Sequence, residues 1–346
     1  MTVPPAEAEN KSGGLGEFGR IARYFAPLAA SAPGALGLKD DAALLTVRPG
    51  HRLAITVDAM VEGVHFLSSD PPELVARKLL RVNLSDLAAM AAVPLAYFLT
   101  MALPSRHDDD WVRHFTTGLG EDQREFGIVL MGGDSVSTPG PATFTVTALG
   151  EVQVLDGDKA GGEVRRSGAR PGDLVCVSGS IGDSALGLLA ATGRLTGSVE
   201  DLAFLAGRYR LPQPRSQLGV GLSRVASAMM DISDGLVADL GHLAAASDVV
   251  AVIEQSRIPL SSAARAATDS AAGLWDTVLT GGDDYELLFT VPPSQASQLA
   301  SLAVQASTPI TVIGRIEASG SIKDSVRVLG LDGEPLSFRN SGWQHR

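Results

Sequence analysis

Short apolar runs alternate with longer helical patterns along most of the chain, and this alternation limits the possible folds more than any other feature. Leu53–Val57, for example, has the length and the β-branched content of a buried strand. A helix is expected over residues 70–92, because Pro71 suits the first helical position and Glu73 completes a capping box. Strands that alternate with helices in this way predict an α/β fold built from packed layers.

The expected elements fall into two halves of similar size. The other expected strands are 96–102, 128–131, 143–149, 174–178, 228–232, 249–254, 285–291 and 310–316. The other expected helices are 110–126, 184–191, 201–209, 217–226, 236–246 and 293–303. Between the halves, residues 150–172 are rich in Gly and in charged residues, and a length of 346 residues suits two domains. We expect a disordered tail at 1–14, an N-terminal domain at 15–153 and a C-terminal domain at 154–346.

Charge and cysteine content exclude several classes of function. The chain has 28 Lys+Arg and 39 Asp+Glu, a formal net charge of −11, so it has no general basic surface for nucleic acid or for an anionic membrane. Leu87–Pro104 is long enough to span a membrane, but Pro94 divides it, and a buried helix end that leads into a buried strand explains it better. Cys176 is the single cysteine and no secretory pattern begins the chain, so we expect a cytoplasmic protein.

Several aspartates occur where carboxylates are unusual, at the ends of apolar strands or inside apolar helices. They are Asp40, Asp41, Asp58, Asp86, Asp134, Asp231 and Asp234. Burying a carboxylate without a partner is costly, and few Lys or Arg residues lie nearby in the sequence to neutralise these groups. Divalent cations could do so. A set of oxygen ligands without clustered Cys or His favours Mg²⁺, Mn²⁺ or Ca²⁺ over zinc.

Each of these aspartates also has a structural interpretation. Asp234 could cap the helix that follows it, Asp134 could form an Asx turn, and Asp40–Asp41 could be an ordinary turn. Asp86 is the hardest to explain in this way, because with Asn83 it forms a polar patch on one face of an otherwise apolar helix. We therefore interpret Asp86 as a functional residue.

The usual nucleotide-binding motifs are absent or misplaced. The chain has no P-loop pattern, and Gly14–Gly19 matches G-x-G-x-x-G without a preceding strand, so we interpret that match as accidental. Two other residues keep two interpretations each. His65, in a Gly-containing loop, either binds a ligand or bonds to the backbone, and Trp343 either docks the end of the chain or stacks on a flat ligand.

A set of short motifs covers nearly the whole chain after residue 15 in the order found in one enzyme family. They are GEFGRIARYF (16–25), DDAALL (40–45), TVDAMVEGVHF (56–66), VNLSDLAAM (82–90), GGDS (132–135), RSGARPGD (166–173), GDSALGL (182–188), DISDGL (231–236) and GGDDYEL (281–287). By these motifs the chain resembles the thiamine-monophosphate kinases. The resemblance implies a two-domain fold of the aminoimidazole-ribonucleotide-synthetase type, with each half a mixed sheet packed with helices, and a homodimer joined through the N-terminal domains. The implied reaction is direct, in-line and ATP-dependent phosphorylation of thiamine monophosphate to thiamine diphosphate, the last step in making that cofactor.

The same resemblance assigns roles to individual residues. The implied magnesium ligands are Asp41, Thr56, Asp58, Asp86, Asp134, Asp231 and Asp234. The implied ATP contacts are Gly133, Asp134, Arg166 and Ser233. The implied contacts with thiamine monophosphate are His65, Asp283 and Trp343, the last by stacking. The resemblance implies several Mg²⁺ ions, ATP as co-substrate, K⁺ as a candidate further cofactor, and no protein nucleophile.

The chain departs from the family pattern at a few positions. Lys39 and Ala91 stand where Gly is common, Val57 stands where Thr is frequent, and Asp283 replaces the usual Glu. The alternative function is that of another ATP-using enzyme of the same superfamily, such as a selenophosphate synthetase, an aminoimidazole-ribonucleotide synthetase or a hydrogenase-maturation protein. A reactive Cys is typical of the first and the last, whereas Cys176 is expected in a buried strand, which favours the kinase. A non-catalytic binding protein is a further alternative, which the full set of aspartates disfavours.

Overall fold

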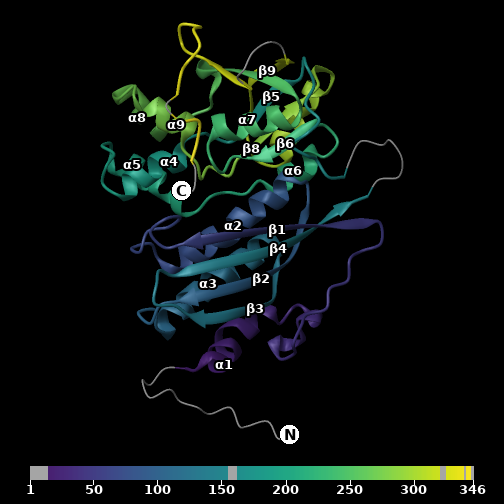
Figure 1. Ribbon diagram of the computed structural model, residues 1–346, viewed down its shortest axis with the longest axis vertical. Helices are drawn as coiled ribbons and strands as arrows, with labels where there is room; N and C mark the ends of the chain where they lie inside the picture. Colours follow the sequence, from purple (N-terminus) through teal and green to yellow (C-terminus); the bar gives the residue numbers. More distant parts are fainter. Residues whose placement is uncertain (1–14, 155–161, 320–324, 339, 344–346) are drawn as a thin grey trace, which may run out of the picture. The chain divides into compact units, whose positions relative to one another are not determined.

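The computed structural model describes residues 15–154, 162–319, 325–338 and 340–343, which form two compact units (Figure 1). Unit 1 comprises residues 15–49, 53–83 and 94–151, and unit 2 comprises residues 50–52, 84–93 and the described residues from 152 onward. Each unit is a mixed sheet packed with helices, so the expected α/β class is confirmed.

Unit 1 contains a four-stranded sheet in the order β1-β4-β2-β3. Its strands are β1 (His51–Val61), β2 (Val93–Leu103), β3 (Val129–Ser137) and β4 (Thr143–Gln153). Strands β2 and β3 are parallel. Two helices, α2 (Pro72–Ala89) and α3 (Asp109–Phe126), pack on one face of the sheet (Figure 1). The side chain of Asp108 caps α3 by accepting the N–H of Trp111, and the helix ends at Gly127 in the left-handed conformation.

Aromatic rings and a buried ion pair make up much of the core of unit 1. The rings of Phe115 on α3 and Phe144 on β4 stack with their centroids 4.9 Å apart, and Trp111 stacks on both. Between α2 and α3, Arg81 donates two hydrogen bonds to Asp122, with N–O distances of 2.7 and 2.9 Å. Both side chains are almost fully buried, and the pair belongs to a larger network, because Asp122 also pairs with Arg77 at 2.8 Å and Arg81 also pairs with Glu125 at 2.7 Å.

Before the sheet, the chain forms a run of short helical segments. They are α1 (Glu17–Arg20), η1 (Ile21–Phe25), η2 (Ala26–Ala29) and η3 (Pro33–Leu38). Ala29 and Ala35 from this run are buried against Ala96 on β2 and Met131 on β3. The sequence pattern predicts no helix here, because the alanines that pack on the strands give only a weak hydrophobic contrast.

Unit 2 contains a six-stranded sheet in the order β10-β7-β9-β5-β8-β6, in which only the β10–β7 pair is parallel. Its strands are β5 (Leu174–Ser178), β6 (Ala228–Asp231), β7 (Val249–Glu254), β8 (Leu287–Val291), β9 (Ile310–Ala318) and β10 (Val326–Leu329). Its helices are α4 (Asp183–Ala191), α5 (Val199–Arg210), α6 (Ser216–Leu222), α7 (Leu236–Ala246), η4 (Gln255–Arg257), α8 (Ser262–Ser270), α9 (Leu274–Thr280), η5 (Pro293–Gln298) and α10 (Leu299–Gln305).

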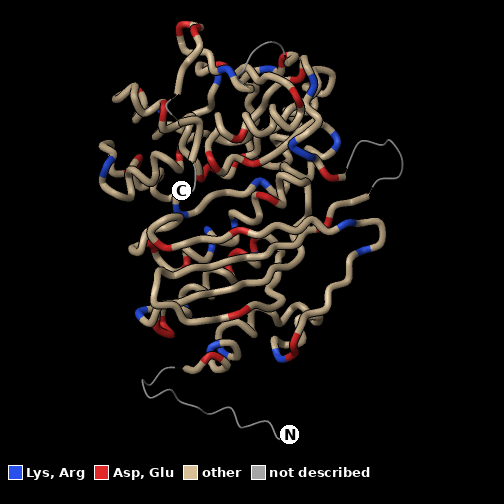
Figure 2. Tube along the Cα trace, in the orientation of Figure 1, with Lys and Arg blue, Asp and Glu red and all other residues tan. Residues whose placement is uncertain are grey.

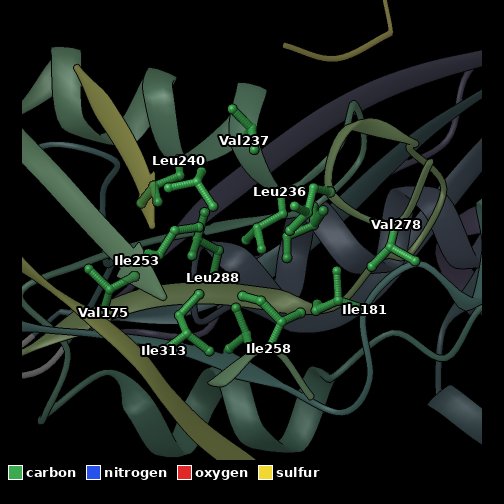
Figure 3. Packing of buried hydrophobic residues seen from close by; sticks show 14 of the residues in the cluster. Val175, Ile181, Leu236, Val237, Leu240, Ile253, Ile258, Val278, Leu288 and Ile313 are labelled. Carbon is green, nitrogen blue, oxygen red and sulfur yellow. The ribbon is translucent and has the colours of Figure 1, made fainter. Parts of the chain in front are cut away.

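The sheet of unit 2 is covered on both faces. Val175 and Leu288 belong to a cluster that includes Leu236 and Leu240 of α7 (Figure 3). Their neighbours along the strands, including Cys176, belong to a second cluster with residues of α6 and α10. Strands that are buried on both faces read as continuous apolar runs, which is how these strands appear in the sequence.

Most expected elements occur, but some local expectations were wrong. β1 continues to Val61 and β3 continues through Gly132–Ser135, so Asp58 and Asp134 lie within strands and not after their ends. The expected helix at 293–303 is divided into η5 and α10. Helices α8 and α9 and strand β10 were not expected, and short alanine-rich helices such as α8 (SAARAATDS) again give little hydrophobic contrast.

The apolar run Leu87–Pro104 contains the end of α2 and all of β2, which confirms the expectation of a helix end that leads into a strand. Among the helices in the described part of the chain, none is long and apolar enough to cross a membrane.

Candidate active site

Unit 1 contains a cavity of about 500 Å³ beside β3. One part of its lining is apolar, with Phe25, Phe98 and Met131 among the residues. The other part is polar and includes Asp41 and Asp134, which were expected as metal ligands. Apolar walls with a few convergent polar groups are typical of sites for small ligands. A flat aromatic base on the apolar side and a metal-bound phosphate on the acidic side would suit this lining.

Gly133 lines this cavity at a point where the backbones of β2 and β3 approach closely. In the parallel pairing of β2 and β3, Gly133 lies opposite Leu99 and Asp134 lies opposite Thr100. A Cβ atom on Gly133 would lie 1.8 Å from the carbonyl oxygen of Leu99. No side chain fits there, so a glycine at this position keeps β3 in register and sets the place of the exposed Asp134. Asp134 also accepts the N–H of Ser135 at 2.8 Å.

The two other expected ligands of unit 1, Thr56 and Asp58, lie on β1. Both are half-buried, and the backbone N–H of Asp58 donates to Oδ1 of Asn83 on α2 at 3.1 Å. Asn83, which the sequence analysis noted only as a polar neighbour of Asp86, therefore holds the edge of β1 in place. Asp58 and Asp134 lie on opposite edges of the sheet, because β1 and β3 have two strands between them and are about 14 Å apart at the usual strand spacing.

His65 follows β1 in the same unit. Its Nδ1 accepts the backbone N–H of Val61 at 3.0 Å, so the other ring nitrogen carries the proton in the neutral tautomer. The carbonyl oxygen of His65 accepts a hydrogen bond from Nζ of the buried Lys78. The backbone-bonded interpretation of His65 is thus confirmed for Nδ1, and the bond fixes the direction of the ring.

In unit 2, the end of α2 meets the end of β6. Ser85 donates its hydroxyl hydrogen to Oδ2 of Asp231 at 2.7 Å, and both side chains are buried. Asp86, the next residue on α2, is half-buried. Ser85 is a residue that the sequence analysis did not single out. Its position beside Asp86 was the only available signal, because a serine in a helix has many structural explanations.

The loop that carries Ser233 and Asp234 is fixed by hydrogen bonds to Asp239, a residue of α7. Oδ2 of Asp239 accepts the backbone N–H groups of Ser233, Asp234 and Gly235 at 3.0, 3.0 and 3.1 Å. Gly235 is the N-cap residue of α7, so the interpretation of Asp234 as the helix cap was wrong. Burial raises the pKa of Asp239 to about 7, with the nearby Asp234 carboxylate acting in the same direction and the three N–H groups acting against it.

The acidic residues of the GGDDYEL segment (281–287) differ in role: Asp283 is a candidate site residue, whereas Asp284 and Glu286 support the fold. Asp283 and Tyr285 have left-handed backbone conformations, with φ of 71° and 51°, and the hydroxyl of Tyr285 donates to Oδ1 of Asp283 at 3.2 Å. Asp adopts this conformation more readily than most residues, but it is costly for an aromatic residue such as Tyr285, and strained backbone is concentrated at functional sites. The strain at Tyr285 therefore supports a functional role for this segment.

Asp284 and Glu286, by contrast, support the fold. Asp284 accepts the backbone N–H groups of Gly182 and Ser184 at the start of α4, and its complete burial holds its pKa well above the usual range. Glu286 accepts hydrogen bonds from Ser178, at 2.6 Å, and from the guanidinium groups of two arginines of unit 2. These buried carboxylates fix the strand that follows Asp283.

The last expected residues of unit 2 are Trp343 and Arg166. The backbone N–H of Trp343 donates to the carbonyl oxygen of Asp234 at 2.9 Å, while 54% of the residue is exposed. Trp343 therefore docks through its backbone and leaves much of its indole accessible. Arg166 is exposed, and its carbonyl oxygen accepts the hydroxyl of Ser247 at 3.2 Å.

The expected metal ligands thus occur in smaller groups and not as one cluster. Over the described ranges, no three His, Cys, Asp or Glu side chains are grouped so that they could hold a metal ion. Acidic residues occur along the strands and helices of both units as well as in loops (Figure 2). Asp239 was not predicted as a functional residue, although the signal that singled out Asp86, a carboxylate inside an apolar helix, applies equally to it.

Comparisons with known proteins match both units. The AIR synthase related protein N-terminal domain matches residues 39–152, and the AIR synthase related protein C-terminal domain matches residues 170–327. The thiamine-monophosphate kinase of Caulobacter vibrioides is 43% identical over 333 residues, which cover 95% of this chain and 90% of that protein. The thiamine-monophosphate kinase of Bacillus subtilis is 34% identical over 316 residues, which cover 90% and 93% of the two chains.

Solved structures give the same result. The thiamine-monophosphate kinase of Stenotrophomonas maltophilia K279a matches with a TM-score of 0.79 and 38% identity, over 91% of this chain and 98% of that one. A structure of AaThiL complexed with AMPPCP and TMP matches with a TM-score of 0.74 and 31% identity, over 96% and 97%. A complex of the hydrogenase maturation protein HypE with ATP also matches with a TM-score of 0.74, but at 21% identity this likeness shows the fold alone.

Proposed function

The chain belongs to the thiamine-monophosphate kinase family, and from this premise we propose how its residues carry out the reaction. The enzyme transfers the terminal phosphoryl group of ATP to thiamine monophosphate and so forms thiamine diphosphate. The proposal is carried above all by the cavity beside β3, where apolar side chains, the Gly132–Gly133 backbone and Asp134 converge. We propose that ATP lies there, with its base on the apolar side and its phosphates toward Asp41 and Asp134.

Mg²⁺ ions suit the donor atoms that the chain offers. Asp41, Asp134 and Asp234 form no ion pair with a Lys, Arg or His among the residues that the structure describes. Carboxylates of this kind, with hydroxyl groups such as that of Thr56, are the hard oxygen donors that Mg²⁺ prefers. We propose the ligand set Asp41, Thr56, Asp58, Asp86, Asp134, Asp231 and Asp234. Bound Mg²⁺ would neutralise the phosphate charge that otherwise keeps two anionic substrates apart.

The chain's own residues supply position and not covalent chemistry. In the transfer that we propose, a terminal phosphate oxygen of thiamine monophosphate attacks the γ-phosphorus of ATP in line with the leaving ADP, so no protein nucleophile is needed. Gly133 and Ser233 would contact ATP, because a backbone without a side chain and a hydroxyl can both approach phosphate oxygens. Arg166, which is exposed, would contribute its guanidinium to the same nucleotide.

Three residues are proposed for thiamine monophosphate. The ring of His65, oriented by its bond to Val61, presents its second nitrogen to the substrate. Asp283, which is one methylene shorter than the usual Glu, is directed by the hydroxyl of Tyr285. The accessible indole of Trp343 would stack on a flat ring of the substrate.

We also propose a homodimer joined through unit 1. Ile55 and Val57 on the edge strand β1 are 62% and 58% exposed, and an apolar edge strand of this kind is typical of a surface that another chain covers. A second copy would also explain the wide separation of Asp58 and Asp134, since a partner's β3 beside β1 could bring two such carboxylates together. We place the enzyme in the cytoplasm, which its free, buried Cys176 supports.

The test is a turnover assay with purified protein, ATP and Mg²⁺, with and without K⁺, on thiamine monophosphate, thiamine and selenide. We expect product only from thiamine monophosphate. We expect Asp134→Asn to lose activity by about 100-fold or more, because metal ions contribute several kcal/mol to phosphoryl transfer. Asp110→Asn, which changes an exposed carboxylate on α3, is the matched control and should keep its rate. Turnover of another acceptor, or near-normal rates in Asp134→Asn, would overturn the proposal.

A further inference from the structure

The loop between β6 and α7, residues 232–235, is the point at which three segments of unit 2 meet. The carbonyl oxygen of Ser233 accepts the N–H of Asp283 at 2.9 Å. The next carbonyl oxygen, that of Asp234, accepts the N–H of Trp343 at 2.9 Å. Two residues proposed for thiamine monophosphate are therefore tied by their backbones to a loop that carries a proposed magnesium ligand.

Two glycines show how closely these segments pack. A Cβ atom on Gly282 would lie 2.2 Å from the carbonyl oxygen of Ser233, and one on Gly342 would lie 2.7 Å from that of Asp234. A Cβ atom on Gly342 would also lie 2.4 Å from Cβ of Ala238, so neither position can accept a side chain without displacing atoms that are fixed to the backbone of the loop or of α7. Any movement of the loop would therefore move Asp283 and Trp343 with it.

Asp239 holds this loop from the opposite side. Its residue is 2% exposed, and one carboxylate oxygen accepts all three N–H groups of Ser233, Asp234 and Gly235. Within the described residues it has no ion pair with a Lys, Arg or His, so these N–H groups are what stabilise its buried charge. Such a bond pattern requires one particular loop conformation, since three consecutive N–H groups must point at one atom.

We propose that Asp239 is a positioning residue for the phosphoryl transfer. By fixing the loop 233–235, it presets Asp234 for the metal and, through the loop's two carbonyl groups, sets the places of Asp283 and Trp343 for the substrate. The inference rests on the proposed function of those three residues. It goes beyond that function because Asp239 is buried and is not one of the proposed ligands, and because it couples metal binding and substrate binding through one loop.

The test compares Asp239→Ala and Asp239→Asn with the wild-type enzyme. Calorimetry measures the Kd of thiamine monophosphate in the presence of AMPPCP and Mg²⁺, and a rate assay measures the Mg²⁺ concentration that gives half the maximal rate. We expect both quantities to rise by about tenfold or more in Asp239→Ala, as happens when the groups that orient metal ligands are removed. Asp239→Asn keeps an acceptor oxygen, so its Kd and its Mg²⁺ requirement should lie between those of the wild type and of Asp239→Ala. If Asp239→Ala does not fold, Asp239→Asn alone tests the proposal.

Asp173→Ala is the matched control. Asp173 is also buried in unit 2, where its carboxylate accepts the N–H of Arg170 and the hydroxyl of Ser227, away from the loop. Asp173→Ala should lower the Tm without changing the Kd of thiamine monophosphate or the Mg²⁺ requirement. If Asp239→Ala behaves in the same way, Asp239 is only a helix cap and the inference is wrong.

Asp234→Asn separates this inference from the proposed function. If Asp234→Asn leaves the Mg²⁺ requirement unchanged, the proposed ligand set is wrong. If it raises the requirement while Asp239→Ala and Asp239→Asn do not, the ligand set stands and only the positioning role of Asp239 is wrong.

Discussion

Replacing Gly133 by Ala tests whether the contact between two backbones, and not a general preference for glycine, shapes the proposed nucleotide cavity. The added Cβ would lie 1.8 Å from the carbonyl oxygen of Leu99, whereas Cβ contacts under 3.0 Å essentially do not occur. The oxygen belongs to the backbone of β2 and cannot rotate away. Strands β2 and β3 would therefore have to separate locally by about 1.2 Å, the difference between these two distances.

The cost of that separation can be worked out from the ladder between the strands. About two hydrogen bonds beside Gly133 would be stretched or lost, at about 1 kcal/mol each. Forcing an extra methyl group into a packed site adds about 1–3 kcal/mol. We therefore expect the free energy of unfolding of unit 1 to fall by about 3–5 kcal/mol in Gly133→Ala. Because Asp134 follows directly on β3, the Kd of AMPPCP with Mg²⁺ should rise as well.

The assay is urea unfolding followed by the fluorescence of Trp111, which lies in the aromatic core of unit 1. Replacing Trp275 and Trp343 by Phe in every protein compared removes the other two indoles, so that the signal reports on unit 1 alone. The midpoint of the transition, at an unchanged slope, gives the loss of stability. Binding of AMPPCP is measured separately in proteins that keep Trp343.

Gly132→Ala is the matched control for stability. There the added Cβ would lie 3.2 Å from Cδ1 of Phe98, a side-chain atom that can move by the few tenths of an ångström required. We expect a loss below about 1 kcal/mol. If Gly132→Ala and Gly133→Ala lose the same stability, the close approach of Leu99 is not what selects glycine at position 133, and the reasoning is refuted.

Three further predictions follow from the burial of single groups. Asp122→Ala should lower the free energy of unfolding by about 3–5 kcal/mol in a urea titration, because it removes two hydrogen bonds from the buried guanidinium of Arg81 and one from that of Arg77; a loss below about 1 kcal/mol would contradict this. Burial raises the pKa of the Cys176 thiol to about 12, so at pH 8 a thiol reagent should label the native enzyme no faster than it unfolds, and labelling at the rate of a free thiol would show that the strand is accessible. Trp343→Ala should weaken the binding of thiamine monophosphate much more than that of ATP in calorimetric titrations, whereas equal weakening would mean that the tryptophan only docks the end of the chain.

The sequence predicted the strands of unit 2 better than those that carry the acidic residues of unit 1. Strand β5 was recognised with its bounds correct, because strands covered on both faces consist almost wholly of apolar residues. Strand β3 was expected to end at Met131, since Gly and Asp are uncommon in strands. β3 continues to Ser137 because it stays paired with β2 along this whole stretch. The two backbones approach so closely at position 133 that only glycine fits there. The need for glycine at position 133 is set by Leu99 on β2, which lies more than 30 residues earlier in the chain. Local strand propensity therefore cannot predict it.

Asp86 and Asp239 gave the same signal in the sequence, and their positions within their helices now separate them. Asp239 lies in the first turn of α7, so its carboxylate can reach back to backbone N–H groups that have no partner within the helix. Asp86 lies in the last turn of α2, where carbonyl groups and the negative end of the helix dipole disfavour an anion. The N–H groups that stabilise the first carboxylate do not exist at the second position, and a cation is the ligand that would offset both the burial and the dipole. A half-buried carboxylate at a helix C-terminus is therefore stronger support for a metal ligand than one near an N-terminus, which favours Asp86 over Asp239 as a proposed Mg²⁺ ligand.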